Sequence, residues 1–94
     1  MNYIFDIDGT IADTPEKDYY KAEPDEAMIN LVNMLYDEGH KIIICTARGT
    51  GRHKDFRPIT RTQLKRWGVK YHKLMFGIIV SDKVVTPEEF LNGI

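Results

Sequence analysis

The chain has 94 residues, of which 43% are hydrophobic, with 13 basic and 14 acidic side chains and a net charge of −1. This length suffices for one domain, residues 1–94, but is short for an enzyme that encloses its substrate, so we expect an open site. No apolar run approaches the roughly 20 residues that span a bilayer, the first residues do not resemble a signal peptide, and the single cysteine cannot form an internal disulfide. We therefore predict a cytoplasmic protein without a membrane role.

Charge is unevenly distributed along the chain. Residues 1–38 carry ten acidic and two basic side chains, whereas residues 48–73 carry nine basic side chains and one acidic side chain. A basic segment attracts phosphorylated ligands, although it is equally typical of a solvated helix face. We expect a phosphorylated small molecule or a nucleic-acid end as partner, and polymeric nucleic acid stays open.

The first half of the chain predicts a strand, a loop and a helix. Residues 2–7 form a short apolar run that acidic residues interrupt and end, typical of a central strand. Residues 12–24 are polar and contain two prolines, so we expect a loop that overhangs the site. A helix is expected to begin at Asp25 and end at Gly39. Its apolar side chains at helical spacing are Met28, Leu31, Val32 and Leu35.

The second half continues the alternation of strands and helices. Residues 41–45 are a β-branched run without polar alternation, which indicates a strand covered on both faces. Residues 49–57 suggest a flexible basic loop, and an amphipathic helix that Gly68 closes should follow. The remaining expected elements are a short strand within 69–76, an apolar run over 77–80 and a C-terminal helix after Thr86, where a capping box begins.

This alternation predicts an α/β fold, a three-layer Rossmann-like domain with a central, mostly parallel sheet and helices on both faces. Ligands bind beyond the carboxyl ends of the strands in such sheets. Three expected strands end in polar residues, at 6–10, 46–49 and 81–83. We therefore place the candidate site at this edge.

Asp6 and Asp8 lie two residues apart at the end of the first expected strand. Two carboxylates on one face repel each other unless a cation lies between them. Mg²⁺ prefers oxygen ligands and commonly combines one or two carboxylates with a substrate phosphate. Gly9 lets the backbone approach that phosphate closely. An acidic turn after a strand is the simpler interpretation of this short motif.

Two ordered motifs resemble those of the haloacid dehalogenase (HAD) superfamily of phosphatases. Asp6-Ile7-Asp8-Gly9-Thr10 is similar to the first signature of the superfamily, and the apolar run ending in Thr46-Ala47-Arg48 resembles the second. The second motif resembles the form found among small phosphatases and the phosphatase domains of polynucleotide kinases. The resemblance covers nearly the whole chain and implies a domain without an inserted cap.

The resemblance implies a role for each matching residue. Asp6 would attack phosphorus and form an aspartyl-phosphate, while Asp8 would protonate the leaving oxygen and later activate water. Mg²⁺ would be held by Asp6, the backbone carbonyl of Asp8, the phosphate and Asp82. The groups expected to hold the phosphate oxygens are Thr46, the backbone N–H groups of Gly9 and Ala47, and Arg48.

One feature departs from the family. Relatives place a lysine directly after the Phe-Gly that is Phe76-Gly77 here, whereas this chain has Ile78. A cation near the nucleophile stabilises the transferring group, and Lys73 is the nearest candidate substitute, with Lys83 and Arg48 behind it.

Other residues carry weaker functional signals. Cys45 is expected to pack inside the protein, and Trp67 to belong to the core. The three histidines lack metal-ligand spacing and are interpreted as structural or surface residues. Three arginines could bind a second phosphate or a sugar of the substrate, or could equally line a solvated loop: Arg48, Arg52 and Arg57.

The leading functional prediction is Mg²⁺-dependent hydrolysis of a small phosphate monoester. Removal of a terminal phosphate from a polynucleotide is the alternative within enzymes. The missing lysine favours a third possibility, a weakened module that binds magnesium and phosphate without turnover. Because an open site admits water, a second subunit or a large substrate would help to close it, and the sequence therefore allows a homo-oligomer.

Overall fold

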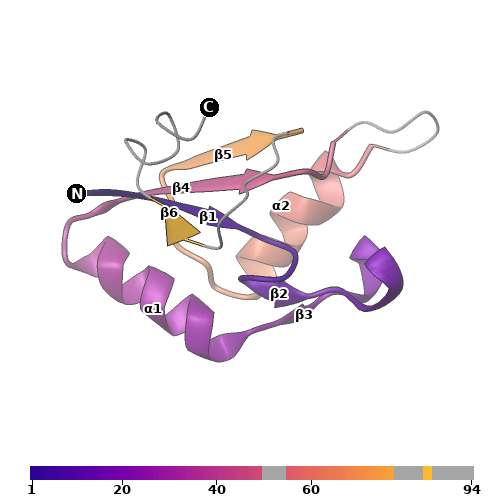
Figure 1. Ribbon diagram of the computed structural model, residues 1–94, viewed down its shortest axis with the longest axis horizontal. Coiled ribbons are helices and arrows are strands. Elements are labelled where there is room, and N and C mark those ends of the chain that lie inside the picture. The colour runs from indigo at the N-terminus through magenta and orange to yellow at the C-terminus, as the bar shows by residue number, and fades with distance from the viewer. Residues whose placement is uncertain (50–54, 78–83, 86–94) are drawn as a thin grey trace.

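The computed structural model describes residues 1–49, 55–77 and 84–85. Its elements are β1 (Asn2–Asp6), β2 (Ala12–Asp13), the 3-10 turns η1 (Pro15–Lys17) and η2 (Tyr19–Lys21), β3 (Glu23–Pro24), α1 (Glu26–Asp37), β4 (Lys41–Thr46), α2 (Arg57–Arg66), β5 (Lys73–Phe76) and β6 (Val84–Val85). Figure 1 shows β5, β4 and β1 running side by side, with α1 and α2 beside the sheet. No helix among the described residues is both long and apolar enough to cross a membrane.

The sheet has the strand order β5-β4-β1-β6. Strands β5, β4 and β1 are parallel, and the short β6 pairs antiparallel with β1. The register aligns Asp6 with Cys45 and Thr46 with Phe76, so the parallel strands end close to one level. The α/β fold with a mostly parallel sheet is confirmed, while the predicted helices on both faces are described on one face only, that of α1 and α2.

The main core lies between the sheet and the two described helices. Phe5 and Ile44 from the sheet join Ile29 and Val32 of α1 and Leu64 of α2 in one buried cluster. Burying one such side chain contributes about 1.5–3 kcal/mol, so both helices are held to the same sheet face. The opposite face carries a smaller cluster around Ile4 and Cys45. The helix expected after Thr86 and the apolar run over 78–80 lie outside the described residues.

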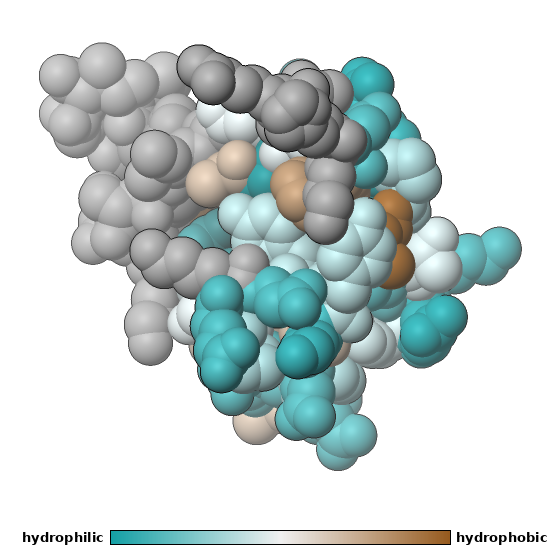
Figure 2. Space-filling view, turned by 90° about the vertical axis from the view of Figure 1, so that its right-hand side faces the viewer, coloured by the Kyte–Doolittle hydropathy of each residue, from teal (hydrophilic) through white to brown (hydrophobic). Residues whose placement is uncertain are grey.

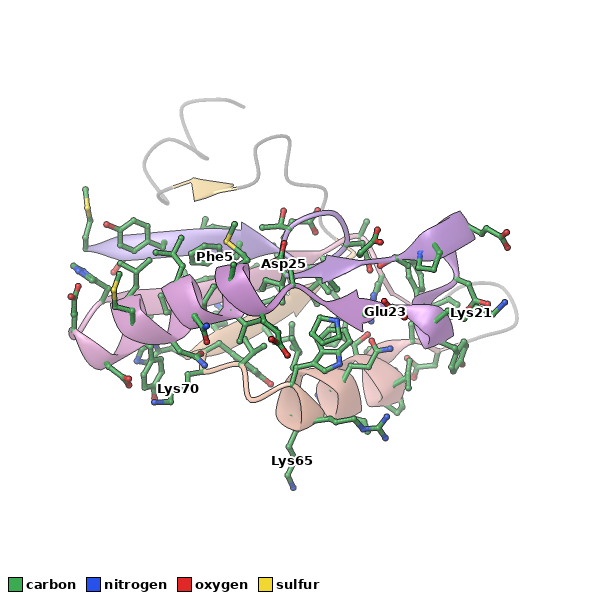
Figure 3. The ribbon with its side chains drawn as sticks, turned by 90° about the horizontal axis from the view of Figure 1, so that it is seen from below. Phe5, Lys21, Glu23, Asp25, Lys65 and Lys70 are labelled. Atoms are coloured by element: carbon green, nitrogen blue, oxygen red, sulfur yellow. The ribbon has the colours of Figure 1, made fainter. Side chains whose placement is uncertain are left out.

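Helix α1 begins and ends close to the predicted residues. The carboxylate of Asp25 accepts a hydrogen bond from the N–H of Met28 at 3.1 Å, which caps the first turn; Figure 3 shows Asp25 at this end of the helix. Gly39 follows the last turn with a φ of +93°. The predicted apolar face was partly wrong, because Ile29 is buried whereas Leu31 is 38% exposed at the margin of the face.

Helix α2 confirms the second predicted helix. Pro58 lies in its first turn, where the missing N–H costs no intrahelical bond. Trp67 directly follows the helix and packs, half-buried, against the main core, as expected. The exposed Lys65 points away from the protein body (Figure 3).

The segment between β1 and α1 is more ordered than the predicted loop. Ala12 pairs with Pro24 and Asp13 with Glu23 in a two-stranded sheet, and the two 3-10 turns lie between these strands. Gly9 has a φ of +87° and its N–H donates to the carbonyl of Ala12 at 2.7 Å. All of residues 7–25 are described and they hold no inserted domain, in agreement with a domain without a cap.

Candidate active site

A cavity of about 440 Å³ lies at the carboxyl end of β1. Figure 2 looks onto the edge where the parallel strands end, and the described surface there is mostly hydrophilic. The cavity is lined by Asp6, Asp8, Gly9, Asp13, Thr14, Tyr19 and Ala47. The structure therefore brings together the two segments that the sequence singled out after β1 and after β4. It adds three side chains that the sequence analysis missed, those of Asp13, Thr14 and Tyr19.

Asp6 is the last residue of β1 and is half-buried. Its Oδ1 accepts a hydrogen bond from the N–H of Ile7 at 2.8 Å. Burial raises the pKa of Asp6 and the charge of Asp8 adds to this, against the lowering effects of the Ile7 hydrogen bond and of Arg48. The described residues thus do not fully offset the negative charge of the Asp6 carboxylate, so an additional cation beside it would stabilise its ionised form.

Asp8 forms a two-pronged ion pair with Arg48. Nε of Arg48 donates to Oδ2 at 2.9 Å, Nη2 donates to Oδ1 at 2.7 Å, and the hydroxyl of Thr14 also donates to Oδ1. The side chain of Arg48 is fully buried, whereas that of Asp8 is 25% exposed. Planar guanidinium and carboxylate groups match in this geometry, which fixes orientation as well as distance.

The expectation that Arg48 holds phosphate or lines a solvated loop was therefore wrong. Its guanidinium turns inward, where Nη1 donates to Oγ1 of Thr60 at 3.2 Å and to Oε1 of Gln63 at 2.5 Å. The ring of Tyr19 lies 4.7 Å from its Cζ, in the range of a cation–π contact. A buried charge requires such partners, and α2 and the η2 turn supply them.

Thr46 and Gly9 differ from their expected roles as phosphate ligands. Thr46 is fully buried and its hydroxyl accepts a hydrogen bond from the N–H of Arg48 at 3.1 Å. The N–H of Gly9 is already used by the carbonyl of Ala12. Gly9 lines the cavity all the same, as does the exposed Ala47, whereas Thr46 is not among the lining residues.

Lys73 does not take the place of the missing lysine. It is the first residue of β5 and aligns with Ile43, at the end of the strand remote from Phe76 and Thr46. A parallel strand runs toward the site, so its first residue is the most distant one. Among the described residues, Arg48 is the cation whose charge lowers the pKa of Asp6.

Other predicted residues are placed as follows. Cys45 is buried, as expected. Nδ1 of His72 accepts a hydrogen bond from the N–H of Ile42 at 3.0 Å, and the ring stacks on Tyr36, so its role is structural. The remaining candidates Arg52, His53, Asp82 and Lys83 lie outside the described residues.

The cavity residues suit a hard cation in their chemistry. Three of the lining residues, Asp6, Asp8 and Asp13, carry carboxylates, and Mg²⁺ takes oxygen ligands. Within residues 1–49, 55–77 and 84–85, however, no three His, Cys, Asp or Glu side chains are grouped closely enough to hold a metal ion. Asp82 remains the predicted additional ligand.

Comparison with known proteins identifies the family. The family model of the polynucleotide kinase PNKP phosphatase domain, a HAD-type phosphatase domain, matches residues 1–83. A crystal structure of an MCSG target protein from Vibrio cholerae superimposes with a TM-score of 0.70 at 26% identity, over 95% of this chain and 85% of that one. No curated protein sequence matches significantly. The chain belongs to the PNKP phosphatase domain family of the HAD superfamily.

Proposed function

We propose that the protein is a Mg²⁺-dependent phosphohydrolase that cleaves phosphate monoesters through an aspartyl-phosphate on Asp6. The observation that carries this proposal is the shared cavity of Asp6 and Asp8 at the end of β1. A phosphate in this cavity would have one carboxylate available for attack and a second one beside it for proton transfer. The family supports a phosphatase in general, and the two carboxylates suggest the route.

The first half-reaction transfers the phosphoryl group to the protein. A carboxylate oxygen of Asp6 forms a bond to phosphorus while the bond from phosphorus to the ester oxygen breaks. Asp8, carrying a proton at this stage, gives it to the departing oxygen, which leaves as an alcohol. Such proton transfer contributes typically about 10²- to 10⁴-fold to the rate.

The second half-reaction regenerates Asp6. Asp8, now ionised, takes a proton from a water molecule whose oxygen attacks the phosphorus of the aspartyl-phosphate. The bond from phosphorus to the Asp6 oxygen breaks, so inorganic phosphate leaves and the carboxylate is restored. One side chain acts first as acid and then as base, and it must stay in place through both steps.

Mg²⁺ would be held by the carboxylate of Asp6 and the backbone carbonyl of Asp8, with Asp82 as a further ligand. When bound, it would offset negative charge on the transferring phosphoryl group. The raised pKa of Asp6 favours a site of this kind, because burial and the charge of Asp8 both disfavour an isolated carboxylate.

Removal of a terminal phosphate from a polynucleotide is a second candidate. The matching family model is that of a polynucleotide kinase phosphatase domain. Helix α2 also exposes Arg57, Arg61 and Lys65 at intervals of four residues, a basic stripe on one face. Contacts of this stripe to phosphates would make cleavage of oligonucleotide ends, but not of a small ester, fall steeply with salt.

The test compares phosphate release from 4-nitrophenyl phosphate by the native protein and by Asp6→Asn, with Mg²⁺ and with a chelator. Asp37→Asn is the matched control, since this exposed carboxylate contacts Lys70 on the surface. We expect Asp6→Asn and metal removal each to abolish turnover, while the control retains it. Equal activity in native protein and Asp6→Asn would refute the proposal. Mg²⁺ binding without turnover would favour the binding module.

A further inference from the structure

We propose that Gln63, together with Thr60, is a positioning residue that holds Asp8 in place through Arg48. This inference rests on the proposed function, in which Asp8 transfers protons. The side-chain hydrogen bonds of both residues go to Arg48 and to backbone carbonyls rather than to Asp8. Both are buried on α2, where Gln63 is 5% exposed and Thr60 is fully buried. Their side chains reach the far side of the guanidinium that binds Asp8.

The guanidinium transmits this constraint because it is rigid. Its N–H donors lie in one plane in a fixed fork. Nη1 is fixed from α2 by Oγ1 of Thr60 at 3.2 Å and Oε1 of Gln63 at 2.5 Å. The edge formed by Nε and Nη2 must then face Asp8, whose two oxygens accept from it. The direction of the carboxylate is thereby set from α2.

Gln63 also fixes the wall of the cavity. Its Nε2 donates to the backbone carbonyl of Tyr19 at 2.6 Å, and the ring of Tyr19 covers the guanidinium and lines the cavity. The orientation of the amide is unambiguous, since Arg48 can only donate and a carbonyl can only accept. One buried amide therefore joins the acid/base group, its cation and the η2 turn.

A positioning role predicts a dependence on the leaving group. An ester with a good leaving group, such as 4-nitrophenyl phosphate, departs with little help from an acid. An alkyl ester, such as glycerol phosphate, needs a proton on its departing oxygen. Displacing Asp8 should therefore slow the alkyl ester far more than the aryl ester. Loosening of the fold as a whole would slow both substrates alike.

The first experiment measures kcat and KM for both substrates with Gln63→Met, which keeps length but removes both hydrogen bonds. We expect kcat for the alkyl ester to fall about 10- to 100-fold, within the range of general acid catalysis. For the aryl ester we expect a fall below about threefold, with little change in KM for either. An equal fall for both substrates would overturn the inference, as would no change.

A second set of variants remains informative if Gln63→Met does not fold. The hydroxyls of Thr60 and Thr62 both donate to carbonyls four residues earlier, those of Phe56 and Pro58. Only the hydroxyl of Thr60 also accepts from Arg48. Thr60→Val should reproduce the selective loss of activity on the alkyl ester. Thr60→Ser, which keeps the hydroxyl, and Thr62→Val should both cleave the alkyl ester at the native rate. A similar loss in both valine variants would contradict the inference.

The two proposals fail in different ways. If the native protein shows no hydrolysis that Asp6→Asn abolishes, the proposed function fails and the positioning role fails with it. If the native protein cleaves both esters and the Gln63 and Thr60 variants keep the native ratio of their rates, only the positioning role fails.

Discussion

The ion pair between Asp8 and Arg48 provides a quantitative test of the structure through Arg48→Met. The variant keeps an unbranched apolar stem but leaves the carboxylate of Asp8 without its cation. Breaking a buried ion pair from one side costs about 3–5 kcal/mol. Because the side chain of Asp8 is 25% exposed, water offsets part of this loss, and we expect about 3 kcal/mol. That is a large share of the roughly 5–14 kcal/mol typical of a chain of 94 residues.

Urea unfolding of the metal-free protein measures this cost directly, and a double-mutant cycle with Asp8→Asn isolates the pair. We expect the double variant to be less destabilised than the sum of the single variants, since an amide needs no counter-charge. Arg48→Lys should fall between native and Arg48→Met, because an ammonium keeps the charge but cannot form the fork. A loss below about 1 kcal/mol for Arg48→Met with additive single effects would show that the two groups are not paired in solution.

Three further predictions concern charge and backbone. Burial raises the pKa of Asp6, so the contribution of this group to stability is present at low pH and is lost as pH rises through the folded pKa. Without metal, Asp6→Asn should therefore have a higher melting temperature than the native protein at pH 7. An equal or lower melting temperature would contradict this. Hydrogen bonds from Arg57 lower the pKa of the exposed Asp55 to about 2. The small contribution of Asp55 to stability is therefore present above its unfolded pKa of 3.8 and is lost as pH falls through about 2. NMR titration should show the pKa of Asp55 rising in Arg57→Gln. Gly9 and Gly39 have φ of +87° and +93° with open space at the Cβ position. Replacing either glycine with alanine should lower the free energy of unfolding in urea by about 1 kcal/mol. Only Gly9→Ala should also reduce phosphatase activity.

The fold was largely predictable because its signals are local. The apolar runs at 2–7 and 41–45 correspond to β1 and β4, which lie side by side in the sheet. The cap at Asp25 and the stop at Gly39 bound α1 within a residue or two. The pairing of β2 with β3 was not predictable in this way, since Pro24 and its polar neighbours carry no strand pattern.

The site was predictable only where spacing alone decides it. Asp6 ends β1 and Asp8 follows it two residues later, so their proximity is fixed by two residues of backbone. The contacts of Gln63 span 15 residues to Arg48 and 44 to Tyr19. Nothing in the pattern of α2 distinguishes a buried glutamine from a solvated one before the partner across the core is known.

The cation beside the two carboxylates is Arg48 rather than the predicted Lys73. Lys73 was predicted as the substitute because it is close in sequence to the position of the family's missing lysine. It lies at the start of β5, however, and each residue of a strand spans about 3.3 Å, so Lys73 is distant from the site at the other end. Arg48 is the second residue after β4, so its guanidinium needs only the length of its own side chain to reach Asp8. Once inside, it must be satisfied at every donor, and the polar residues of α2 that meet this need also determine where Asp8 points. The charge that pairs with Asp8 is therefore inseparable from the packing of α2 against the sheet.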